Sequence, residues 1–128
     1  MDRESVTIVL PLPAKVLHPN TMIASIGGRL CKAAATKRFR RLAMEAVERE
    51  QVETAPWGQA LVSATFYHST KRCRDQDGAM SSLKAAYDGI VDAGLVENDD
   101  PKHMRREIPE FDTDRGCPRV VLTITRLQ

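Results

Sequence analysis

The sequence predicts a small α/β (α+β) domain in which two main helices pack on a mixed β-sheet of about four strands. Three observations predict this fold. Several segments alternate apolar with other residues, which is the period of a β-strand. Two other segments carry apolar residues at spacings of three and four, which is the period of a helix. The chain has 128 residues, enough for one hydrophobic core but not two, so we expect a single domain, 1–128.

Strict alternation predicts three strands. SVTIVL (5–10) places apolar residues on one face and is followed by prolines. GQALVSATFYHST (58–70) alternates in the same way, and RVVLTITRL (119–127) closes the chain with the same pattern. A short edge strand over 103–108, followed by a turn-rich loop, completes the predicted sheet.

Apolar stripes predict two helices, one over about 29–52 and one over about 79–93. The stripes are Phe39, Leu42, Ala43 and Ala46 in the first helix, and Met80, Leu83, Tyr87 and Ile90 in the second. Gly94 suits the left-handed position that ends a helix. Lys84 falls on the polar side of the second helix, with Asp88.

Positive charge is unevenly distributed, although the net charge is only +2. Two basic clusters contain no acidic residue: Arg29, Lys32, Lys37, Arg38, Arg40 and Arg41 in the first, and Lys71, Arg72 and Arg74 in the second. Clustered basic residues are typical of surfaces that bind a polyanion such as nucleic acid. A solvated helix face is an equally good interpretation of the charge pattern. However, the first cluster lies in the N-terminal half of its helix, where the macrodipole disfavours cations, and this favours a binding role.

Composition narrows the class of protein. No apolar run is long enough to span a bilayer, and the N-terminus lacks the features of a signal peptide, so we expect a cytoplasmic protein that does not bind membranes. Three scattered cysteines without a CxxC pair fit reduced thiols. Sequence motifs for an EF-hand, a P-loop or a serine nucleophile elbow are absent.

Acidic residues stand on both sides of the second helix. Asp75 and Asp77 precede it and Asp99 follows it, with Lys84 between them. On an extended segment, carboxylates two residues apart share one face and could hold Mg²⁺, which prefers oxygen ligands. Asp99 can approach them only if the segment after the helix doubles back. A third carboxylate would complete a site able to activate water beside a phosphate, and the flanking Arg72 and Arg74 would suit that phosphate.

Each of these residues also has an ordinary structural interpretation. Asp75 or Asp77 could cap the helix, because aspartate accepts hydrogen bonds from backbone N–H groups at helix N-termini. Asp99 could belong to a simple turn, and Lys84 could pair with Asp88 at i, i+4. Taken together with the basic residues beside them, the acids favour the metal site.

The order of elements, with LPLPAKVLHPN (10–20) after the first strand and RDQDGAMSSLKAAYDGIVDAGLVENDD (74–100) at the centre, resembles the RusA family of Holliday-junction resolvases. The central block of that family runs as a DxDN motif, a lysine, a helix, a glycine and a closing acidic pair. Two departures are present: Gly78 replaces the asparagine of the motif, and a few extra residues precede Lys84.

The resemblance implies that Asp75, Asp77 and Asp99 bind Mg²⁺, which Mn²⁺ could replace, and that Lys84 lies near the scissile phosphate. It implies a structure-specific endodeoxyribonuclease, encoded by a bacterium or its phage. The enzyme would act as a homodimer on four-way DNA junctions in recombination and repair. Residues implicated in DNA contact, from the basic clusters and the resemblance, are Lys71, Arg72, Arg74, Lys37, Arg38, Arg40, Arg41 and Asn20.

Two alternatives stay open. The chain could bind nucleic acid without catalysis, with the aspartates serving as turn residues. It could also be a nuclease for other branched DNA, such as forks or flaps.

Overall fold

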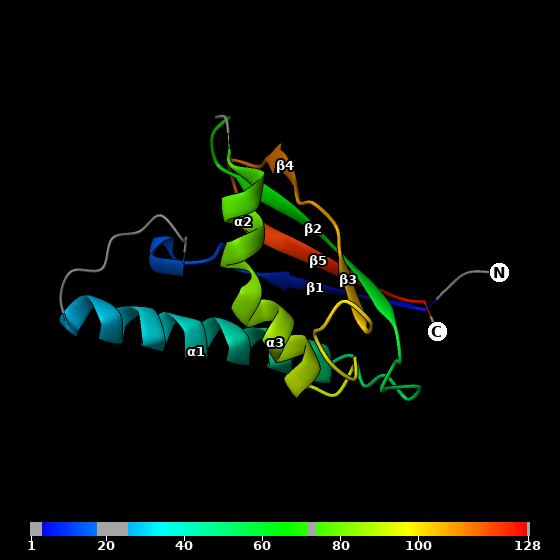
Figure 1. The fold of residues 1–128 in the computed structure, drawn as a ribbon. Coiled ribbons are helices and arrows are strands. Elements are labelled where there is room, and N and C mark those ends of the chain that lie inside the picture. Colours follow the sequence, from blue (N-terminus) through cyan, green and yellow to red (C-terminus); the bar gives the residue numbers. More distant parts are fainter. Residues whose placement is uncertain (1–3, 18–25, 72–73, 128) are drawn as a thin grey trace.

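The computed structural model describes residues 4–17, 26–71 and 74–127, and it confirms a small mixed α/β domain (Figure 1). Helices cover one face of a five-stranded sheet. None of the described helices is long and apolar enough to cross a lipid bilayer. The elements are β1 (Ser5–Leu10), the 3-10 helix η1 (Lys15–Leu17), α1 (Ile26–Glu48), β2 (Ala60–His68), α2 (Gln76–Ser82), α3 (Lys84–Asp92), β3 (Met104–Arg106), β4 (Glu110–Thr113) and β5 (Arg119–Arg126).

The sheet has the order β1-β5-β2-β3, and β4 pairs with β2 beyond β3. β5 runs antiparallel to both β1 and β2, whereas β3 and β4 run parallel to β2. β4 corrects the sequence prediction of a turn-rich loop at this point. Its four residues, EFDT, carry one apolar side chain, too few for a recognisable alternation, and the strand forms because the end of β2 offers it a partner.

The predicted alternation of the three long strands is confirmed. Every second residue of β1, of β2 as far as Phe66 and of β5 as far as Ile124 is buried beneath the helices. These residues are Val6, Ile8, Leu10, Ala60, Val62, Ala64, Phe66, Val120, Leu122 and Ile124. Because side chains alternate between the two faces of a strand, one apolar face per strand is enough to build the core.

α1 begins earlier and ends earlier than the sequence predicts. In the described part of α1 the first buried residue is Phe39, followed by Ala43 and Val47 on the same stripe. The helix ends at Glu48 instead of Val52, and Gln51 then adopts a positive φ of 48°, which a continuing helix does not allow. Only the C-terminal half of α1 therefore packs into the core.

The predicted helix over 79–93 is two helices, α2 and α3, which meet at Leu83. The last turn of α2 is tightened, because the Leu83 N–H donates to the Met80 carbonyl, three residues back. The buried Ser82 hydroxyl also donates to the Ala79 carbonyl at 2.6 Å, a contact that disturbs helical hydrogen bonding. Gly94 follows α3 with a φ of +83°, which confirms its predicted left-handed conformation.

Candidate functional site

Asp75 and Asp77 lie at the N-terminus of α2. Asp75 is the N-cap, and its Oδ1 accepts a hydrogen bond from the Asp77 N–H at 3.1 Å. Asp77 lies in the first helical turn, where the helix macrodipole favours a carboxylate. The capping interpretation is thus confirmed for Asp75. The prediction that both aspartates lie on one extended segment is wrong, because Asp75 is extended but Asp77 lies in the first turn of α2.

Both carboxylates are exposed, and neither forms an ion pair with any residue that the structure describes. Lys71 and Arg74, the described basic residues just before them, form no ion pair with them. Lys71 is exposed, and Arg74 donates from Nη2 to the Thr70 carbonyl at 3.4 Å. The Arg74 Nε is buried without a hydrogen-bond partner in the described structure. In the described residues, Asp75, Asp77, Lys71 and Arg74 thus form no ion pair, although they are close in sequence.

Lys84, the first residue of α3, lies at the opposite end of α2. Its Nζ donates to Asp99 Oδ2 at 2.5 Å and to Asp88 Oδ1 at 3.0 Å. The contact with Asp88 is the i, i+4 pair that the sequence predicts. The contact with Asp99 confirms that the chain doubles back after α3, because Asp99 returns to the first residue of that helix.

Arg106 of β3 holds Asp99 from the other side. Its Nη2 donates to the Asp99 carbonyl at 3.1 Å and to Oδ2 at 3.4 Å, and its guanidinium lies 4.2 Å from the centre of the Tyr87 ring. Sequence reasoning missed this residue. The signal was present, since period two places Arg106 on the same face of the edge strand as the buried Met104.

These contacts widen the pH range over which both members of the pair are charged. The hydrogen bond from Lys84 holds the pKa of Asp99 below its ordinary 3.8, with a smaller contribution from Arg106. The same contact, together with Asp88, raises the pKa of Lys84 above its ordinary 10.5. Burial raises the pKa of Tyr87 to about 12. Asp99 is therefore a carboxylate whose charge is already balanced.

The structure does not bring Asp99 to Asp75 and Asp77. α2 has seven residues, so its N-terminus, with Asp75 and Asp77, lies about 10 Å from its C-terminus, where Lys84 contacts Asp99. Two oxygens bound to one Mg²⁺ lie at most about 4 Å apart, since each is about 2 Å from the ion. Among the described residues no three His, Cys, Asp or Glu side chains are grouped to hold a metal. The exposed carboxylates of Asp75 and Asp77 have the donor chemistry that Mg²⁺ prefers, and Mg²⁺ binding by Asp75, Asp77 and Asp99 stays a prediction.

The basic residues of α1 divide into paired and unpaired groups. Arg40 donates from Nε and Nη2 to the two carboxylate oxygens of Asp92, at 2.5 and 2.8 Å, and so ties α1 to α3. This contact raises the pKa of Arg40 and lowers that of Asp92. Arg41 lies 3.8 Å from Glu45, and Lys37 is exposed. Arg40 thus has a structural contact that the sequence did not reveal.

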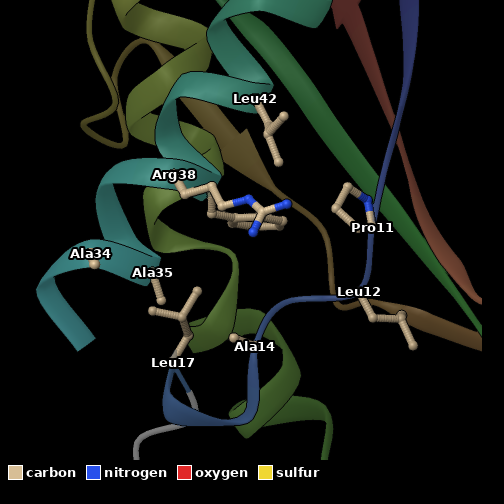
Figure 2. A pocket seen from close by; sticks show the side chains of 9 residues that line it. Pro11, Leu12, Ala14, Leu17, Ala34, Ala35, Arg38 and Leu42 are labelled. Atoms are coloured by element: carbon tan, nitrogen blue, oxygen red, sulfur yellow. The ribbon is translucent and has the colours of Figure 1, made fainter. Parts of the chain in front are cut away.

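Arg38 lies across a hollow of about 390 Å³ between α1 and the segment that follows β1. Figure 2 shows its side chain extending from α1 toward Pro11. The hollow is lined by Pro11, Leu12, Ala14, Leu17, Ala34, Ala35, Arg38, Phe39 and Leu42. With one charged group on an apolar lining, it does not resemble a phosphate site.

Two predicted DNA-binding residues, Asn20 and Arg72, lie outside the described residues. Comparison of the chain with models of protein families and with curated proteins found no match.

Proposed function

We propose that the chain is a metal-dependent endonuclease that cuts branched DNA, with four-way junctions as its first substrate. One observation carries the proposal: the exposed carboxylates of Asp75 and Asp77 have no cation partner among the described residues, although basic residues stand directly before them. Because these carboxylates and the described basic groups form no ion pair with each other, each set is available to bind a ligand of its own. The carboxylates suit a metal ion, and the basic groups suit a phosphate.

In this proposal Asp75 and Asp77 hold Mg²⁺, or Mn²⁺ in its place. The ion would activate a water molecule and offset charge on the phosphoryl oxygens. Asp75 is oriented by the hydrogen bond from the Asp77 N–H, so the first ligand needs little reorganisation. Lys71 and Arg74 would hold the DNA backbone beside the carboxylates.

The proposal also keeps Lys84 and Asp99, on the basis of the resemblance. Their contact at 2.5 Å joins two of the residues that the resemblance places around the scissile phosphate. To act as a metal ligand, Asp99 would have to leave Lys84 and Arg106. Lys84, released from Asp99, would then be available to a phosphate.

Cutting a four-way junction requires incisions in two symmetry-related strands. A twofold homodimer with one site in each subunit meets that requirement, and this symmetry is the commonest among oligomers.

A nucleic-acid-binding module without catalysis is the second candidate. It is favoured by the capping role of Asp75 and by the neutralised charge of Asp99, both of which are structural uses of these residues.

A panel of synthetic substrates distinguishes the candidates. Purified protein with Mg²⁺ or Mn²⁺ should cut a four-way junction faster than a fork, a flap or a linear duplex of the same sequence. Preference for the fork or flap would reassign the substrate. Salt-sensitive binding without cutting of any substrate would reject the nuclease and support the binding module.

A further inference from the structure

The ends of β2 and β4 form a second polar region beside the start of α2. The two strands run parallel, with His68 opposite Thr113, and the Asp114 N–H donates to the His68 carbonyl at 2.8 Å. The C-terminal ends of β2 and β4 therefore lie next to each other, at the same end of the sheet. Figure 1 shows that α2 begins at this end of the sheet. Polar groups that follow parallel strands are well placed for ligands, because the C-terminal edge of a sheet is open to solvent.

A hollow of about 750 Å³ lies between these strand ends, lined by Ser69, Thr70, Lys71, Thr113 and Arg115. A smaller hollow, of about 190 Å³, shares several of these residues and extends to Arg74; its lining is His68, Thr70, Lys71, Arg74, Phe111, Asp112 and Thr113. The two hollows share Thr70, Lys71 and Thr113, and together they make a depression between the end of β2 and the loop after β4.

The charge of this depression is mainly positive. Lys71 and Arg115 are exposed, and neither forms an ion pair with the residues described in the structure. The acid nearest to Arg115 in sequence, Asp114, is already paired with Arg119 at 2.8 Å. Asp112 is the single acid among the lining residues that the structure describes.

The lining also supplies hydroxyl groups from Ser69, Thr70 and Thr113. Hydroxyls donate hydrogen bonds to phosphate oxygens, and arginine binds them with two parallel N–H groups. We propose that Lys71 and Arg115, with these hydroxyls, form a binding site for a backbone phosphate of DNA. The proposal rests on the proposed function for the choice of DNA as the ligand.

This site would position the strand rather than react with it. Arg74 connects the depression to the carboxylates, because it lines the smaller hollow and directly precedes Asp75. A phosphate held by Arg115 would therefore bring the neighbouring part of the backbone to the N-terminus of α2. Arg115 belongs to neither of the basic clusters visible in the sequence, since it comes from the loop between β4 and β5.

The test measures binding separately from cutting. Fluorescence anisotropy with a labelled four-way junction in EDTA should show that Arg115→Gln and Lys71→Gln each weaken binding about 3- to 10-fold near 0.1 M NaCl. Each should also reduce the slope of log K against log [NaCl] by about one, the amount expected for one lost phosphate contact. Arg105→Gln is the matched control, because Arg105 is another exposed arginine without an ion pair among the described residues. Thermal midpoints of all three variants verify folding.

Affinities and slopes of Arg115→Gln and Lys71→Gln that equal those of the parent protein would overturn the phosphate site. An equal loss in Arg105→Gln would overturn it too, since the effect would then be general charge. DNA with a single neutral methylphosphonate linkage provides a second readout. Where that linkage replaces the phosphate that Arg115 contacts, the replacement should weaken binding by the parent protein more than binding by Arg115→Gln. Because EDTA prevents metal-dependent cutting, these results hold whether or not the protein proves to be a nuclease. The substrate panel tests that question independently.

Discussion

The two ends of α2 place carboxylates in opposite electrostatic surroundings. At its N-terminus Asp75 and Asp77 are exposed and, within the described residues, form no ion pair. At its C-terminus Asp99 contacts Lys84 and Arg106. A cation can bind the first end without breaking an ion pair, whereas at the second it must replace contacts that already exist. Residues with the same chemistry in the sequence therefore differ in what they are free to bind.

The difference has a physical origin in how each acid is positioned. Asp75 and Asp77 are placed by local hydrogen bonds at a helix start, which involve N–H groups and no cation. Asp99 is placed by the return of the chain along α3, which brings it against the side chains of Lys84 and Arg106. We call these the unpaired end and the paired end of α2.

The largest expected effect is on cutting and tests the unpaired end. Asp77→Asn should slow cutting of a four-way junction at least about 100-fold. Mutation of a residue that only hydrogen-bonds to a metal ligand already costs about 10- to 100-fold in metal affinity or activity. Junction binding in EDTA should be unchanged. Asp92→Asn, in a structural ion pair with Arg40, is the control and should cut within about twofold of the parent. Normal cutting by Asp77→Asn would reject the metal role of this end.

The second effect is on stability and tests how closely α3, which begins at the paired end, packs against α1. A Cβ on Gly89 of α3 would lie 2.3 Å from the Arg40 carbonyl oxygen of α1 and 2.9 Å from the Ala43 Cβ. Gly89→Ala should lower the free energy of unfolding by about 3 kcal/mol, because the helices must separate. Gly58→Ala, which meets no atom within 4 Å, should change it little. Urea denaturation measures both, and equal stability of the variants would contradict the close helix packing.

The third effect separates the structural role of Asp75 from its proposed metal role. Asp75→Ala removes the cap of α2 and should cost about 1 kcal/mol in the free energy of unfolding. Asp75→Asn keeps a capping oxygen and should cost a few tenths at most. Both variants should lose cutting, since neither has a carboxylate. If Asp75→Asn cuts normally, Asp75 is only a cap.

The smallest effect is the pH dependence of stability at the paired end. The pKa of Asp99 is lower in the folded than in the unfolded protein, so its ion pair stabilises the fold above pH 3.8 and this contribution disappears as pH falls through the folded pKa. The pKa of Lys84 is raised, so its contribution is complete below pH 10.5 and disappears as pH rises beyond the folded pKa.

Asp99→Asn should therefore be less stable than the parent between these limits, by no more than about 1 kcal/mol because Lys84 is largely exposed. The difference between the two proteins should shrink below pH 3.8. Thermal unfolding across pH 2–7 measures it, and a difference that stays constant across this range would show that the pair does not couple to folding.

Much of the fold could be predicted from local patterns. The first strand has the predicted bounds, and the alternating residues of β2 and β5 are buried as expected. The helix division at Leu83 could not be predicted, because one apolar stripe continues through it. β4 could not be predicted either, since its formation depends on pairing with the distant β2.

The candidate site was predictable in composition but not in arrangement. Sequence spacing anticipated the Lys84 contact with Asp88 and the return of the chain after α3, but not the contact of Lys84 with Asp99. It did not anticipate the contact of Arg106 with Asp99, because the parallel pairing of β3 with β2 decides which residues the side chains of β3 meet. Nor did it anticipate Arg115, which comes beside Lys71 only through the shared end of β2 and β4.

The sequence by itself determined the three alternating strands, the apolar stripes of the helices, the Gly94 helix end and the pairing of Lys84 with Asp88, since each depends on side chains a few residues apart. Only the tertiary structure decided which charges are neutralised. An ion pair depends on the distance between two side chains, and that distance is set by how strands and helices pack across the whole domain. The tertiary structure thus left Asp75 and Asp77 unpaired within the described residues, while it enclosed Asp99 between Lys84 and Arg106.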